Sequence, residues 1–173
     1  MEGSVQFSEI QHFYKNSTVF LTGATGFVGK LVLEKLLRQC HVKHVYLLIR
    51  EKDGVDAETR CANIFDGTAF DPLRRIDPEF FKKVSLIAGD CEKPDLGLSE
   101  LDKASLIKEV EFIFHCAANT KLDATLREAT NINVRATRDL LNIAKEAENL
   151  KRIFKRFVIH WKRVHEDPFD DEA

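Results

Sequence analysis

The sequence predicts a three-layer α/β fold with a parallel sheet in the strand order 3-2-1-4-5. Short apolar runs rich in β-branched residues alternate with helical patterns, which is typical of a parallel sheet covered by helices on both faces. A glycine-rich turn follows the first apolar run and opens the first helical pattern. With 173 residues, the chain has the length of one ordinary domain with a single core.

The composition is that of a globular protein from a reducing compartment. Hydrophobic residues make up 44% of the chain and charged residues 31%, and no apolar run approaches the roughly 18 residues of a membrane-spanning helix. The net charge of −2 gives no basic field that would attract nucleic acid. No secretory signal is visible, so we expect a soluble, intracellular chain. Neither a disulfide framework nor a metal site is indicated by the wide spacing of Cys40, Cys61, Cys91 and Cys116.

The first half of the chain supplies two strands and two helices. Thr18–Thr22 is a short apolar run with β-branched residues, and glycine ends it, so it is predicted as the first strand. The run His44–Ile49 is almost entirely apolar and is predicted as a strand buried on both faces. A polar helix is predicted from about 56 to 65. The helix between the two strands is predicted to bury a stripe of Val28, Leu31, Val32, Leu36 and Leu37.

The second half continues the alternation. Val84–Ala88 is predicted as the third strand, a polar helix follows around 99–108, and Val110–Cys116 is predicted as the fourth strand. The longest helix is predicted from about 122 to 147. Its buried stripe is predicted to include Leu126, Ile132, Leu140, Leu141 and Ile143.

A weaker fifth strand is predicted at Arg156–His160, and the sheet is predicted to be truncated after it. The expected organisation is an N-terminal segment (1–16), a nucleotide-binding domain (17–161) and an acidic tail (162–173) that is solvated and disordered.

The turn after the first strand has the spacing Gly23-x-x-Gly26-x-x-Gly29, which predicts a Rossmann-like dinucleotide site. The first glycine permits a tight turn, the second lets the backbone approach a pyrophosphate, and the third permits close helix–strand packing. The alternative is a glycine-rich turn without a ligand, but the flanking strand and helix favour binding. The residues predicted to contact the cofactor here are Thr22, Gly23, Thr25, Gly26, Phe27, Val28 and Gly29.

The residues after the second strand favour NADP(H) over NAD. An NAD site usually has an acidic residue there to bind the ribose 2′-hydroxyl, whereas this chain has Arg50, with Lys52 close by. A guanidinium can pair with a 2′-phosphate through two hydrogen bonds. Two alternatives stay open, namely that Arg50 is only a solvated charge, or that a small change of register brings Glu51 to the ribose.

The ends of the third and fourth strands complete the predicted cofactor site. Asp90 is expected to accept a hydrogen bond from the adenine amino group, and Cys91 to donate its backbone N–H. The small residues Ala117 and Ala118 let the backbone pass close to the ribose and pyrophosphate. His115 is interpreted as a residue packed at a strand end rather than an acid–base group, because no partner is evident nearby.

Taken together, these residues resemble the extended short-chain dehydrogenase/reductase superfamily. Within it, they are most similar to the NADP-binding portion of the alcohol-forming fatty acyl-CoA reductases. The resemblance covers almost everything from Phe13 to about Lys151. It rests on Phe13-Tyr14, Val19–Lys30, Leu33–Leu37, Tyr46–Arg50, Gly89-Asp90, Phe114–Ala118 and Asn131–Val134.

The resemblance implies reduction of a long-chain fatty acyl-CoA by NADPH, through an aldehyde, to a fatty alcohol. It also implies association with the peroxisomal or endoplasmic-reticulum membrane through segments beyond this chain. Asn133 matches an asparagine that supports a proton relay in the superfamily, although the residue alone would be interpreted as an ordinary helix position. Oligomeric state and acyl chain length leave no signal in the sequence.

The family's catalytic Tyr-x-x-x-Lys pair is absent from this sequence. Its only tyrosines are Tyr14 and Tyr46, and neither is followed by lysine four residues on. We therefore expect a truncated form that keeps cofactor binding and lacks turnover on its own. The alternatives are a non-catalytic NADP-binding module, and a nucleotide-sugar epimerase or related extended reductase.

Overall fold

The computed structural model describes residues 8–121 and 123–155, and its sheet has five strands in the order β3-β2-β1-β4-β5. All four neighbouring pairs are parallel. The predicted fold class and strand order are therefore confirmed. The strands are β1 (Thr18–Thr22), β2 (His44–Ile49), β3 (Val84–Ala88), β4 (Phe112–His115) and β5 (Arg152–Lys155).

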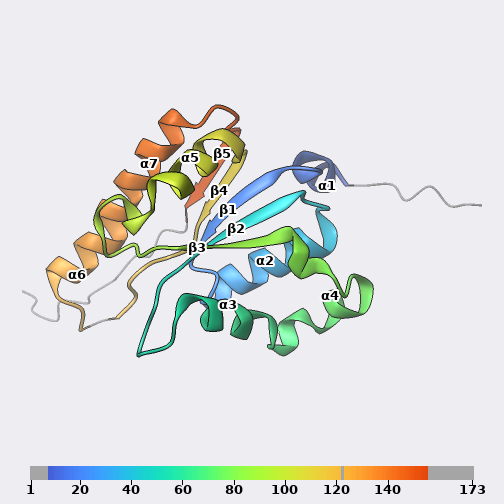
Figure 1. Ribbon diagram of the computed structural model, residues 1–173, viewed down its shortest axis with the longest axis horizontal. Helices are drawn as coiled ribbons and strands as arrows, with labels where there is room; N and C mark the ends of the chain where they lie inside the picture. The colour runs from blue at the N-terminus through green and yellow to red at the C-terminus, as the bar shows by residue number, and fades with distance from the viewer. Residues whose placement is uncertain (1–7, 122, 156–173) are drawn as a thin grey trace, which may run out of the picture.

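The helices form the outer two layers. Their bounds are α1 (Glu9–Tyr14), α2 (Phe27–Gln39), α3 (Ala57–Phe65), α4 (Asp71–Ile76), α5 (Glu100–Glu109), α6 (Leu126–Thr130) and α7 (Ala136–Glu146). In Figure 1, α2, α3 and α4 lie on one side of the sheet, and α5 and α7 lie on the other. A π-helical turn, Asn131–Arg135, joins α6 to α7. Short 3₁₀ turns occur at Thr68–Phe70, Phe80–Lys83 and Pro94–Gly97.

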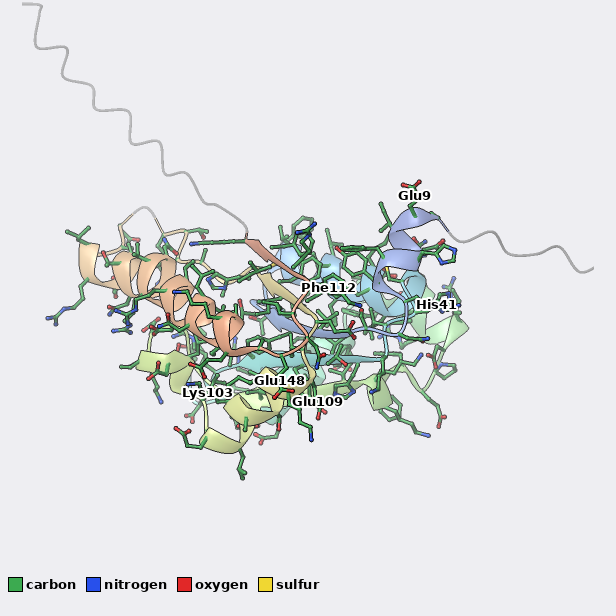
Figure 2. The ribbon with its side chains drawn as sticks, turned by 90° about the horizontal axis from the view of Figure 1, so that it is seen from above. Glu9, His41, Lys103, Glu109, Phe112 and Glu148 are labelled. Carbon is green, nitrogen blue, oxygen red and sulfur yellow. The ribbon has the colours of Figure 1, made fainter. Side chains whose placement is uncertain are left out.

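Two apolar clusters, one on each face of the sheet, form the core. Side chains alternate along a strand, so Leu21 of β1 belongs to the cluster under α2, while Phe20 belongs to the cluster with α7. Every residue of β1 is buried, as a central parallel strand requires. At the amino end of β4, the ring of Phe112 lies beside α1 (Figure 2). Tyr14 of α1 contacts this ring at a centroid distance of 4.8 Å. The small helix α1, which the sequence did not predict, thus covers the start of β4.

Two of the predicted helix stripes are wrong in part. Leu31 is 46% exposed, and Leu33 is fully buried instead. The buried residues Gly29, Leu33, Leu36 and Leu37 follow one face of α2, and Leu31 lies off that face. In the longest helix, Leu126 is 84% exposed and Leu141 is 42% exposed. The helix begins at Leu126 rather than near 122, and the π-helical turn then changes the phase that a regular 3.6-residue period assumes.

The fifth strand is also displaced from its predicted position. It consists of Arg152–Lys155, and the predicted strand 156–160 lies outside the described residues, as does the predicted acidic tail. The pairing of β5 with β4 accounts for the position of β5 nearer the N-terminus than predicted. Ile153 pairs with Ile113, and Phe154 stacks on Phe114 at a centroid distance of 4.8 Å. Two apolar residues therefore anchor this short strand, one on each face.

Candidate cofactor-binding site

A cleft of about 230 Å³ lies at the carboxyl ends of the first four strands. This is the edge at which ligands bind in open parallel sheets, at the point where the strand order reverses between β1 and β4. Its lining includes the predicted residues Gly23, Thr25, Gly26, Arg50, Lys52, Asp90, Cys91, Ala117 and Ala118. The other predicted site residues, Thr22, Phe27, Val28, Gly29 and Asn133, are not among its lining residues.

At two of the three glycines of the turn, backbone contacts leave no space for a side chain. Gly23 has φ +78, and a Cβ there would lie 2.5 Å from the amide nitrogen of Ala117. A Cβ on Gly29 would overlap the carbonyl oxygen of Gly23. Gly26 differs, because the nearest atom to its Cβ position would be 3.4 Å away. The first and third glycines therefore serve chain packing, whereas a Cβ at the second would make only an ordinary van der Waals contact.

Gly26 is the N-cap of α2 and provides no side-chain cap. Its N–H donates to the Gly23 carbonyl at 3.0 Å. The next three N–H groups, of Phe27, Val28 and Gly29, belong to the first helical turn and have no acceptor within the helix. The side chain of Phe27 is 79% exposed. Free backbone N–H groups at the start of a helix are favourable partners for an anion.

Thr22 joins the ends of β1 and β4 instead of facing the cleft. Its Oγ1 accepts the N–H of Ala117 at 3.3 Å and shares a hydrogen bond with Nδ1 of His115 at 2.7 Å. The interpretation that His115 has no partner is therefore wrong, whereas its buried position at the strand end fits the structure. Burial, with a smaller effect of Lys155, lowers the pKa of His115 to about 4.

Arg50 lies at the end of β2 within a group of charged residues. Its Nη1 donates to Oε1 of Glu92 at 2.8 Å and lies 3.5 Å from Oδ2 of Asp90. Arg60, from α3, donates to the carbonyl oxygen of Arg50 and also lines the cleft. Glu51 lines an adjoining hollow rather than this cleft.

Asp90 and Cys91 follow β3, and backbone contacts fix their positions. The N–H of Asp90 donates to the Leu96 carbonyl at 2.7 Å, and its Oδ1 accepts the N–H of Glu92 at 2.9 Å. Burial raises the pKa of the Cys91 thiol to about 12, so this thiol stays protonated at neutral pH.

Asn133 lies in the π-helical turn, next to the cleft-lining Ile132. Its Oδ1 accepts the N–H of Asn119 at 2.9 Å, and its Nδ2 donates to the Asn119 carbonyl at 3.1 Å. The asparagine thus holds the segment that follows β4.

Sequence reasoning missed several cleft residues. Gly89 could have been found, since it is a glycine directly after a strand, and a Cβ there would lie 2.7 Å from the Leu96 carbonyl oxygen. Arg60 and Glu92 leave no local signal, because their positions depend on the packing of neighbouring elements against β2. The full set missed is Leu48, Ile49, Arg60, Gly89, Glu92, Cys116 and Ile132.

Comparison with known proteins identifies the family of this chain and several similar reductases. A family model described as "Male sterility protein" matches residues 21–158. The chain is 40% identical over 146 residues to "Fatty acyl-CoA reductase wat" of Drosophila melanogaster, covering 84% of this chain and 28% of that protein. It is 43% identical over 143 residues to human "Fatty acyl-CoA reductase 1", covering 82% of this chain and again 28% of the relative. The chain therefore spans little more than a quarter of the length of these curated relatives.

Among solved structures, the reductase domain of a nonribosomal peptide synthetase from Mycobacterium tuberculosis is 31% identical, with a TM-score of 0.65. The match covers 82% of this chain and 33% of that one. The PhqB reductase domain from Penicillium fellutanum is 28% identical, with a TM-score of 0.63, and the match covers 82% of this chain and 36% of the other.

We expect Gly29→Ala to lower the free energy of unfolding by about 2 kcal/mol or more, because the added methyl group overlaps a backbone carbonyl. Gly26→Ala is the matched control and should cost about 1 kcal/mol or less, since its Cβ would make only an ordinary van der Waals contact. Urea unfolding of both variants measures the difference. Equal losses would contradict the packing role of the third glycine.

We also expect stability to fall as the pH decreases below about 6.5. The pKa of His115 is lower in the folded protein than in the unfolded chain, so protons favour the unfolded chain between about pH 6.5 and 4. The loss attributable to this histidine should reach about 3 kcal/mol at pH 4. Urea unfolding between pH 4 and 8 should show a shallower decline for His115→Asn than for the wild-type chain, and parallel declines would contradict the assignment.

Proposed function

Because the chain belongs to the male sterility protein family, we propose that its cleft binds NADPH for the reduction of a long-chain fatty acyl-CoA to a fatty alcohol. The observation that carries this proposal is the uncapped start of α2 beside the glycine turn, with Arg50 at the end of the neighbouring strand. The backbone N–H groups would bind the pyrophosphate, and the guanidinium would bind the phosphate on the adenosine ribose. The relatives are named reductases, which favours this reading over an epimerase.

The preference for NADPH over NADH is supported by three cations that line the cleft: Arg50, Lys52 and Arg60. Arg60 is fixed next to Arg50 by its hydrogen bond to the Arg50 carbonyl. Two guanidinium groups from different elements can bind one phosphate from two sides. A neutral 2′-hydroxyl would form only weaker hydrogen bonds with these guanidinium groups. Asp90, on the neighbouring loop, is proposed to bind the adenine amino group.

Bound NADPH would supply hydride to the thioester carbon, with loss of coenzyme A, and a second NADPH would reduce the resulting aldehyde. The family resemblance assigns the proton to a tyrosine, and neither tyrosine of this sequence lies in the cleft. Tyr14 packs against Phe112, and the hydroxyl of Tyr46 donates to Glu109 at 2.8 Å. Burial and this hydrogen bond raise the pKa of Tyr46 to about 12. The role proposed for this chain is therefore to bind and orient the cofactor.

In residues 8–121 and 123–155, no helix has the length and apolar character needed to cross a bilayer. Association with the peroxisomal or endoplasmic-reticulum membrane stays a prediction from the family resemblance.

Calorimetric titration with NADPH and NADH tests the cofactor proposal. We expect NADPH to bind more tightly, and Arg50→Ala and Arg60→Ala each to raise its Kd about tenfold or more, because each removes a charge-assisted hydrogen bond. NADH affinity should change little in either variant. Arg75→Ala, which removes a guanidinium from α4 outside the cleft lining, is the matched control. The proposal fails if the folded chain binds neither dinucleotide.

A separate assay tests the division between binding and turnover. The purified chain, incubated with NADPH and a long-chain acyl-CoA, should form no fatty alcohol above background, because the proton donor is missing. Product analysis by mass spectrometry is the measurement. Alcohol formation that depends on NADPH would show that another group in this chain supplies the proton.

A further inference from the structure

Three polar side chains form a row across the carboxyl ends of β1, β4 and β5. The strand register pairs Thr22 with His115, and His115 with Lys155. Paired positions in a parallel sheet place their side chains on the same face, here the face covered by α7. Thr22 and His115 are almost completely buried, and Lys155 is half-buried. A lysine therefore enters the α7 face of the sheet next to a buried histidine.

Lys155 reaches the π-helical turn that precedes α7. Its Nζ donates to the carbonyl oxygen of Asn133 at 2.9 Å and to Oγ1 of Thr137 at 2.5 Å. Thr137 also donates its hydroxyl to the same Asn133 carbonyl, at 2.9 Å. In this turn the N–H of Ala136 bonds five residues back, to Asn131, so the regular helical pairing is interrupted. The ammonium and the hydroxyl together fix the backbone of Asn133 at that interruption.

The side chain of Asn133 extends this contact to the cleft. It holds both the N–H and the carbonyl of Asn119. Asn119 directly follows Ala117 and Ala118, which line the cleft. A continuous set of hydrogen bonds therefore runs from Lys155 through Asn133 to the cleft wall formed by the segment after β4.

We propose that Lys155 is a positioning residue for the nicotinamide half of the bound cofactor. The inference rests on the proposed function. A dinucleotide that crosses the switch point between β1 and β4 places its adenosine over the side of β2, near Arg50, and its other half over the side of β4. Lys155 acts only on the β4 side of the cleft. It fixes the π-helical turn that contains Asn133, and Asn133 in turn holds the segment 117–119. It does not touch the cofactor.

The test compares two ligands in one variant. Lys155→Met keeps much of the side chain's length and removes the ammonium. We expect it to raise the Kd of NADPH about tenfold and to leave the Kd of 2′,5′-ADP, which is the adenosine half alone, within about twofold. Lys155→Arg keeps a donor and should retain tight NADPH binding. Lys145→Met, from the same surface hollow on α7, is the matched control and should change neither Kd.

Hydrogen exchange at the Asn119 amide, measured without ligand, gives a second readout. We expect faster exchange in Lys155→Met than in the wild type or in Lys145→Met, because Asn133 would hold this amide less firmly. An unchanged Kd for NADPH, or equal losses for both ligands, would overturn the inference while leaving NADPH binding by the wild type intact. If the wild type binds neither ligand, the proposed function fails and the inference fails with it.

Discussion

The site is organised by a close approach of three backbone segments at Gly23. The turn after β1, the first turn of α2 and the segment after β4 meet there, and the positions at which a side chain would project into the contact are glycine. Thr22 strengthens the same junction, because its hydroxyl accepts the Ala117 amide while bonding to His115. These segments form one side of the cleft, where backbone contact rather than side-chain packing fixes their spacing. A wider junction would move the start of α2 away from the wall formed by Ala117.

The sequence predicted the inner strands β1, β2 and β4 well, because a strand covered on both faces is apolar along most of its length. Helix phase was harder to predict. Leu31 and Leu33 are equally apolar, but Leu33 shares a face with the buried Gly29, Leu36 and Leu37, and Leu31 does not. A π-helical turn leaves no signal in a 3.6-residue pattern, so the exposed Leu126 was assigned to the buried face. The fifth strand, likewise, depends on pairing with β4 rather than on the apolar run that follows it.

At the site, the sequence predicted positions that follow directly from strand ends, such as Asp90 and Ala117. It could not predict which way a side chain points at such an end, and Thr22 faces His115 rather than the cleft. The sequence also could not predict contacts between separate helices and strands. Arg60 comes to the end of β2 only because α3 packs there, and no local pattern records that packing.

The ion pair between Arg50 and Glu92 means that this corner of the cleft already contains a counter-ion. An incoming anion that takes the place of the Glu92 carboxylate gains the difference between two ion pairs rather than the full value of one. A ligand group with a single negative charge would gain little by that replacement. A group with two charges would gain more, and the corner can therefore select ligands by the amount of charge they bring.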